Sequence, residues 1–335
     1  MKKSIFIFGI IISTIVSCTQ TGKQSDEGKH ETKSPIVLLT DSIAQDSTNI
    51  FLLNRRAQYF IQQHELSKAL IDLNKALLIN SKEPKLFVTL AEIYFQLGKI
   101  ENCSSSLLKA IDLNPLELEA FNKLTQLNLL NKRFDVAMSY NEKALEIDKF
   151  NPKTLYIRGM LFLAKEDTVS AMKNFQLSHD NKPDFYDALI QIGAILNKQH
   201  SPLAADYLKK AVFYFPESSQ ARYELALYFQ ENERPNEAMA QYDTMMMFFP
   251  VNKYVLYNIG YLYLVFGQQF DSAIYYFDKS LTIDPQYVDA LYNKGRTLEE
   301  MGKLMAAKEI YQDVLAHNAN YQLAIDGLNR IDLKK

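Results

Sequence analysis

The feature that most constrains the fold is a pattern of apolar residues that fills the 34 residues of segment 84–117 and then recurs. The first apolar series in this segment has helical spacing, with Phe87, Leu90, Ala91 and Tyr94. Gly98 interrupts it, a second helical series follows, and Pro115 ends that series. The segment is therefore predicted to be a helical hairpin. Because a hairpin this short cannot bury both of its apolar stripes alone, it needs copies of itself on either side.

The copies are present as eight consecutive segments: 50–83, 84–117, 118–151, 152–185, 186–218, 219–252, 253–287 and 288–321. The spacing is 34 residues, except that 186–218 is one residue shorter and 253–287 is one residue longer. Most segments carry a large apolar residue, a small Ala or Gly, an aromatic residue, a second Ala and a closing Pro at similar offsets, although Lys149 and Ala319 replace the Pro of their segments. This pattern resembles the tetratricopeptide repeat (TPR). The resemblance implies an all-α fold, a right-handed superhelical solenoid of about eight helix-turn-helix units.

Shorter helical segments flank the repeats. Residues 35–49 are predicted to form an N-terminal capping helix, in which Ile36, Leu39 and Ile43 cover the open end of the first hairpin. Residues 322–335 begin another first helix and then stop, so they are predicted to be a C-terminal capping helix and tail.

The N-terminus has the organisation of an export signal. Lys2 and Lys3 precede an apolar run from Ile5 to Val16. Twelve helical residues span about 18 Å, which is too short for a hydrocarbon core of about 30 Å. Residues 1–17 are therefore predicted to be a signal peptide. The end of this stretch, Ile-Val-Ser-Cys, resembles the lipobox of bacterial lipoproteins, which implies cleavage before Cys18 and acylation of its thiol and new amino group.

The mature chain would then begin with a lipidated Cys18 and a disordered linker that together occupy residues 18–34. By resemblance to bacterial lipoprotein sorting, Thr19 favours the outer membrane, and the membrane face stays open. The alternative is an ordinary cleaved signal with an incidental cysteine.

Nothing in the sequence predicts catalysis, a cofactor or a metal. The balance of 37 basic and 39 acidic residues gives no field that would attract nucleic acid. The five histidines fall in separate segments, and the glycines form no phosphate-binding loop. Cys103 takes a small-residue position of its helix and is predicted to be buried. We therefore expect a protein that is not an enzyme and has no small-molecule substrate.

What remains is a binding surface. In the TPR family, positions 2, 5, 9 and 12 of each unit line the concave groove, and in the C-terminal repeats these and the neighbouring positions hold tyrosine, apolar and asparagine residues. Tyrosine suits protein binding because it joins a large apolar face to a polar tip. The asparagines are expected to bond a peptide backbone. The alternative is that this set is ordinary family consensus. The predicted groove residues are Tyr156, Met160, Tyr223, Leu227, Tyr254, Tyr257, Asn258, Tyr261, Tyr292 and Asn293.

These features together favour a lipid-anchored scaffold of the bacterial cell envelope that binds polypeptide segments in its groove, as part of an assembly or secretion machine. Its expected partners are proteins or peptides, with the membrane reached through the lipid. Two alternatives stay open: a periplasmic holdase for unfolded clients, and an extracytoplasmic enzyme or carbohydrate-binding protein on a helical solenoid. The absence of Trp weighs against carbohydrate binding.

Overall fold

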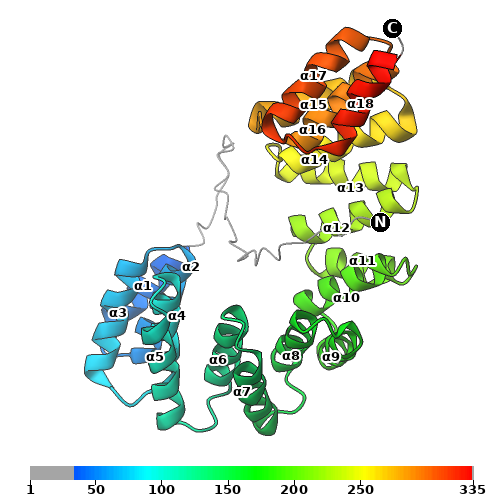
Figure 1. Cartoon of the computed structure of the whole chain (residues 1–335). Coiled ribbons are helices and arrows are strands. Elements are labelled where there is room, and N and C mark those ends of the chain that lie inside the picture. The colour runs from blue at the N-terminus through cyan, green and yellow to red at the C-terminus, as the bar shows by residue number, and fades with distance from the viewer. Residues whose placement is uncertain (1–33, 334–335) are drawn as a thin grey trace, which may run out of the picture. The chain divides into compact units, whose positions relative to one another are not determined.

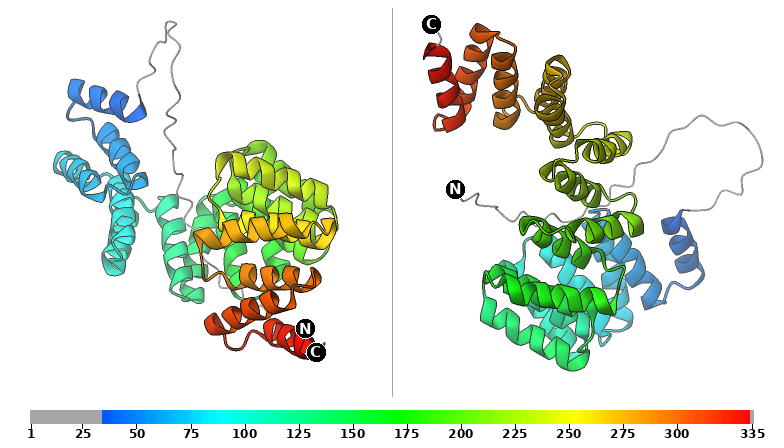
Figure 2. Two further views of the ribbon diagram at one scale, coloured as in Figure 1. Left: turned by 90° about the horizontal axis from the view of Figure 1, so that it is seen from above. Right: turned by 90° about the vertical axis from the view of Figure 1, so that its right-hand side faces the viewer.

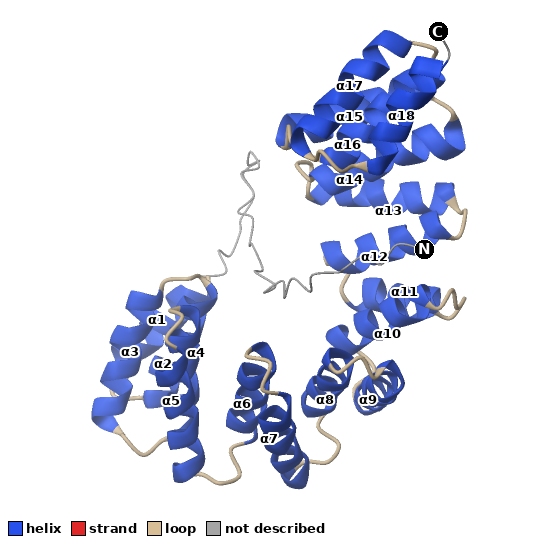
Figure 3. Ribbon diagram, viewed as in Figure 1, coloured by secondary structure: helices blue, strands red, loops and turns tan. Residues whose placement is uncertain are grey.

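The computed structural model describes residues 34–333, and every regular element among them is a helix (Figures 1 and 3). In the first half of the chain the helices are α1 (Pro35–Gln45), α2 (Ile50–Gln62), α3 (Leu66–Ile79), α4 (Pro84–Gln96), α5 (Ile100–Leu113), α6 (Leu118–Leu130), α7 (Phe134–Ile147), α8 (Pro152–Ala164) and α9 (Thr168–Asn181). In the second half they are α10 (Tyr186–Lys198), α11 (Ala204–Tyr214), α12 (Ser219–Glu231), α13 (Pro235–Phe248), α14 (Lys253–Leu262), the π-helix η1 (Tyr263–Gly267), α15 (Phe270–Ile283), α16 (Val288–Glu300), α17 (Leu304–His317) and α18 (Gln322–Leu333). The prediction of an all-α fold is confirmed.

From α2 to α17 the helices pack in consecutive pairs, with one pair in each of the eight repeats. The first helix of a repeat packs on its second helix, and the second packs on the first helix of the next repeat within each part of the chain. Figure 2 shows these pairs following one another. The helix α1 packs on α2 through the buried Ile43, and α18 packs on α17.

A left-handed residue joins the two helices in every repeat. These residues are His64, Gly98, Lys132, Glu166, His200, Glu233, Gln268 and Gly302, with φ between 48° and 74°. The conformation lets the N–H of the following residue reach back five residues, as when Lys99 N donates to Tyr94 O at 2.8 Å. Six of these eight residues are not glycine, so their turns carry the backbone strain that a side chain causes at positive φ.

The two irregular repeat lengths have structural explanations. In the longer repeat, the extra residue is accommodated where α14 widens into the π-helix η1 before the turn at Gln268. In the shorter repeat, the second helix α11 has only 11 residues, whereas the other second helices have 14. Both changes leave the positions of the first helices within the repeat unchanged.

Small residues let the two helices of a repeat approach closely. A Cβ added at Gly260 would lie 2.8 Å from the ring of Phe277, and one at Gly295 would lie 2.9 Å from the ring of Tyr311. Both rings are fully buried. The core is therefore a series of large side chains from the second helices, each seated on a small residue of the first.

The helices form two compact parts, Met1–Lys149 and Phe150–Lys335.

In the first part, a bidentate ion pair joins α2 to α3: Arg56 Nε and Nη2 each donate to a carboxylate oxygen of Asp72 at 2.7 Å. The Asp72 side chain is almost fully buried, so each charge of this pair depends on the other for its stabilisation.

Candidate functional site

In the C-terminal part, the first helices of consecutive repeats are linked by asparagine–tyrosine hydrogen bonds. Asn258 Nδ2 of α14 donates to Tyr223 Oη of α12 at 3.1 Å. Asn293 Nδ2 of α16 donates to Tyr257 Oη of α14 at 3.0 Å. Because each bond joins one repeat to the next, these residues fix the spacing of the first helices along the predicted groove.

A second set of contacts comes from aromatic residues that stand at the N-caps of first helices. Phe185 contacts Tyr156, with ring centroids 5.7 Å apart. Tyr287 contacts Tyr257 at 5.3 Å, and Tyr321 contacts Tyr292 at 5.4 Å. Tyr156, Tyr257 and Tyr292 are thus each covered on one side by the residue that precedes the first helix of the following unit, which is α10, α16 or α18.

The cap aromatics are the residues that the sequence analysis missed. A signal was available, since Phe185, Tyr287 and Tyr321 each occupy the last position of a repeat. Tyr321 also donates its hydroxyl to Asp289 Oδ1 at 2.9 Å, which ties the last loop to α16.

Burial keeps three tyrosines of the first helices, Tyr156, Tyr223 and Tyr257, neutral. It raises the pKa of the Tyr156, Tyr223 and Tyr257 hydroxyls above the ordinary value, because a phenolate would lose its water shell there. At Tyr223 the hydrogen bond from Asn258 opposes part of this effect on the pKa. The Tyr223 and Tyr257 hydroxyls act as hydrogen-bond acceptors for the two asparagines.

The structure corrects the role expected for the two asparagines. Asn258 is 4% exposed and Asn293 is 5% exposed, and their amides donate to tyrosine hydroxyls of the preceding repeat. They are therefore not placed to bond an incoming peptide. Their function in the fold is to join repeats.

Of the other predicted groove residues, seven are half-buried and one, Tyr254, is exposed. Tyr156, Tyr223, Tyr257 and Tyr292 are half-buried and engaged with neighbouring helices. Three more, Met160, Leu227 and Tyr261, are also half-buried. Tyr254 is the most open, at 49% exposed.

Tyr254 lies at the start of α14, beside a cation. Lys253 Nζ is 4.9 Å from the centre of the Tyr254 ring and 5.2 Å from that of Tyr287, and it bonds Asp284 Oδ2 at 2.6 Å. The hydrogen bond to Asp284 raises the pKa of the Lys253 ammonium. The Tyr254 ring is therefore held by its neighbours while one face stays open to solvent.

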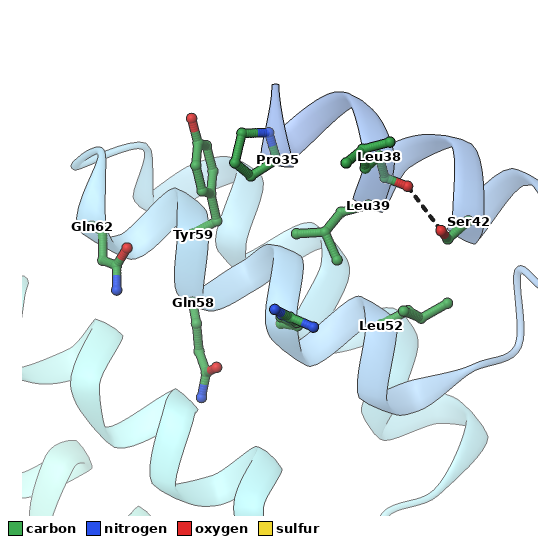
Figure 4. Close-up of a pocket in the computed structure, with 9 residues that line it drawn as sticks. Pro35, Leu38, Leu39, Ser42, Leu52, Gln58, Tyr59 and Gln62 are labelled. Carbon is green, nitrogen blue, oxygen red and sulfur yellow. Dashed lines mark hydrogen bonds between the residues drawn. The ribbon is translucent and has the colours of Figure 1, made fainter. Parts of the chain in front are cut away.

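The N-terminal part has a separate concavity, which the sequence analysis did not anticipate. A pocket of about 490 Å³ lies between α1 and α2, lined by Leu38 and Leu39 on one side and by Gln58, Tyr59 and Gln62 on the other (Figure 4). Gln58 also bonds Thr89 of the next repeat. Ser42 and Arg55 also line it, and a hollow that combines apolar, amide and charged side chains can hold a peptide.

Within residues 34–333, no cluster of His, Cys, Asp and Glu has the arrangement of a metal site. None of the described helices combines the length and the apolar character that crossing a bilayer requires. Cys103 is buried in α5 as predicted, and burial raises the pKa of its thiol. The predicted lipidation site Cys18 and the signal peptide lie outside the described residues.

Comparisons with known proteins bear on the repeats directly. Family models described as tetratricopeptide repeat match residues 84–115 and 254–287, residues 196–245, and residues 276–309. Among curated proteins, the uncharacterized protein ycf37 of Cyanophora paradoxa is 33% identical over 116 residues, which is 34% of this chain and 66% of that protein. The BBSome complex member BBS4 of Bos taurus is 23% identical over 80% of this chain and 55% of its own length. The chain therefore spans only part of these relatives.

Solved structures show the same fold at low identity. Cut9, from the crystal structure of the APC/C hetero-tetramer Cut9–Hcn1, aligns with a TM-score of 0.61 and 16% identity, over 78% of this chain and 52% of Cut9. PilF of Pseudomonas aeruginosa aligns with a TM-score of 0.55 and 19% identity, over 63% of this chain and 96% of PilF. Together with the matched family models and the stacked helical pairs, these alignments show that the chain is built of tetratricopeptide repeats.

Proposed function

We propose that the chain is a lipid-anchored scaffold of a bacterial cell envelope, and that it binds polypeptide segments on the face formed by the first helices of its C-terminal part. TPR proteins bind protein partners, and the described residues offer an aromatic surface for this. The single observation that carries the proposal is Tyr254, which is held by Lys253 and Tyr287 yet is 49% exposed.

The surrounding residues fit a peptide ligand. Tyr261, one turn beyond Tyr257 in the same helix, is half-buried and contacts that ring at 6.4 Å. A rigid aromatic wall of this kind loses little side-chain entropy on binding, because the rings are already fixed by their neighbours. Met160 and Leu227 on α8 and α12 add apolar surface at equivalent positions of earlier repeats.

The test separates binding from folding. The double variant Tyr254→Ala/Tyr261→Ala removes exposed ring surface and keeps Tyr257, which joins repeats. The matched control is Tyr275→Ala, because Tyr275 is 52% exposed on the second helix α15. In crosslinked pull-downs from membranes, the double variant is expected to lose stoichiometric partners that the control retains. Equal recovery by both folded variants would refute the binding face. Recovery of many substoichiometric clients would favour a holdase.

The proposed anchor rests on residues 1–18, in which Cys18 follows closely on the short apolar run from Ile5 to Val16. Two or three acyl chains give stable attachment, at about 0.8 kcal/mol for each buried CH₂. Replacing Cys18 by serine should release the chain from the membrane fraction. A chain that stays in that fraction after the replacement would contradict lipid anchoring without touching the peptide-binding proposal.

A further inference from the structure

The C-terminal ends of α11 and α13 carry an exposed apolar cluster that the peptide-binding face does not include. We call it the aromatic edge, and it consists of Phe213, Tyr214, Phe215, Met247, Phe248 and Phe249. Phe213 is 78% exposed and Met247 is 82% exposed. The two triplets occupy equivalent positions in consecutive repeats, directly before Pro216 and Pro250.

The aromatic edge replaces a turn that four other repeats use. Asn80, Asn114, Asp284 and Asn318 follow the second helices of their repeats, and each side-chain oxygen accepts the N–H two residues later, at 2.9–3.3 Å. This local bond stabilises the end of the helix. Phe215 and Phe249 stand at the same position and have no oxygen to offer.

Two consecutive repeats thus lack a local stabilising bond and place a phenylalanine there that is 37% exposed at Phe215 and 40% exposed at Phe249. Phe215 also contacts the Tyr186 ring of α10, with ring centroids 4.9 Å apart. The end of α9 also lacks such an oxygen, because Lys182 stands there, but only α11 and α13 have phenylalanine at this position. Large exposed apolar side chains at the ends of two consecutive second helices mark a surface kept for something other than the fold of the monomer. The helices α11 and α13 themselves are well packed, because their buried residues belong to one continuous hydrophobic cluster that extends from α10 to α14.

The size of the aromatic edge points to a protein interface. At roughly 200 Å² for a fully exposed large side chain, its six residues leave on the order of 600 Å² open to water. That area is at the upper limit for a patch on a monomer and is close to the ~800 Å² that each partner contributes to a standard interface.

We propose that the aromatic edge is the interface of a homodimer with two-fold symmetry. In such an interface the same patch meets itself, so a two-fold axis between the two helix ends places α11 of one copy against α13 of the other. The charges suit this arrangement: α11 carries the exposed Lys209 and Lys210 and α13 carries the exposed Asp243. Opposite charges then meet across the interface twice.

The same charges disfavour a lipid surface as the occupant. Acidic membranes attract segments with an excess of Lys and Arg. Here Glu217 lies two residues after Phe215 and Asp243 lies four residues before Met247, whereas Lys209 and Lys210 are basic, so the rim of the aromatic edge carries both signs. A second copy of this chain satisfies both signs at once.

The experiment is sedimentation velocity of the full chain over a concentration series. The chain should sediment as a dimer in the micromolar range, and Phe213→Ser/Met247→Ser should raise the dimer dissociation constant by at least about tenfold. Leu78→Ser/Val169→Ser is the matched control, because these residues are 89% and 84% exposed elsewhere. The control should dimerise like the parent. Circular dichroism checks that every variant keeps its helix content.

A charge exchange tests the geometry without removing apolar surface. Lys210→Asp and Asp243→Lys should each weaken the dimer several-fold, by about the strength of exposed ion pairs counted twice. Combining them should restore the parent value to within about twofold. A monomeric parent, a dimer that both serine pairs weaken equally, or a charge exchange that is merely additive would each overturn the proposal. So would a monomer that binds lipid vesicles through Phe213 and Met247.

Discussion

Replacing Gly327 by alanine should detach the last helix while leaving the repeats before it folded. Gly327 lies in the middle of α18, against the ring of Tyr311 from α17. A Cβ added there would lie 2.4 Å from Tyr311 Cε2 and 2.7 Å from Cζ, whereas ordinary contacts begin at 3.4 Å.

The Tyr311 ring cannot move away from the added methyl group, because its other contacts hold it in place. Its opposite edge faces Gly295, where an ideal Cβ position is 2.9 Å from Tyr311 Cε1. Its hydroxyl donates to Glu299 Oε2 at 2.8 Å, and Glu299 in turn bonds Arg330 of α18. The side chain is fully buried. Therefore α18 must move away from Tyr311, because the ring cannot.

Two effects of opposite sign determine the magnitude. Overpacking of a filled contact costs about 1–3 kcal/mol. Alanine at an interior helix position favours the helix by up to about 1 kcal/mol relative to glycine. Because the clash involves a ring fixed on both edges, we take the upper end of the first range and expect a net loss of about 2 kcal/mol in the docking of α18.

Hydrogen exchange with mass spectrometry measures this loss locally. At about 1.4 kcal/mol for each factor of ten, amides of α18 should exchange about 30-fold faster in the variant, with the first repeats unchanged. The control Asn329→Ala improves helix propensity at an exposed position of the same helix and should not accelerate exchange. If α18 is equally or better protected in Gly327→Ala, the reasoning from the pinned ring is wrong.

Three further changes test other contacts, each by urea unfolding followed through circular dichroism. Gly98→Ala should lower the free energy of unfolding by about 1 kcal/mol, since φ is +69° and nothing lies within 4 Å of the added methyl, so only backbone strain is altered. Asp72→Asn should cost about 2 kcal/mol by leaving Arg56 without its buried carboxylate, and an unchanged midpoint would mean that the pair is not formed. Asn258→Ala should cost about 1 kcal/mol, and Tyr223→Phe should add nothing further in the double variant, because both remove the same bond.

The repeat pattern predicts the fold closely because the spacing of the apolar residues determines which face of each helix is buried. Apolar spacing and the stops at Gly98 and Pro115 locate the helix pairs, and the pairs observed lie within the segments that the pattern defines. The turns are less visible in the sequence. Only Gly98 and Gly302 mark the left-handed position with glycine, while residues such as Lys132 and Glu166 adopt it because the packed helices on either side require it.

The site is less predictable because spacing does not show which neighbour a polar group meets. Asn258 and Asn293 stand where a groove residue is expected, yet each turns to a tyrosine of the preceding repeat. Tyr287 shows the converse. It ends a repeat, outside the first-helix positions considered, and it packs on both Tyr254 and Tyr257. Contacts between repeats depend on how the units stack, and a single repeat carries no record of that.

Site-specific photocrosslinking tests the central claim, that the first-helix face of the C-terminal part binds polypeptide partners. A photoreactive amino acid is placed at Tyr254 in one chain and at Tyr275 in another, two positions of nearly equal exposure on the first and second helices of one repeat. Irradiation of intact cells should give a discrete protein adduct from position 254 and none of comparable yield from position 275. Adducts from position 275 alone, or equal adducts from both, would contradict the account.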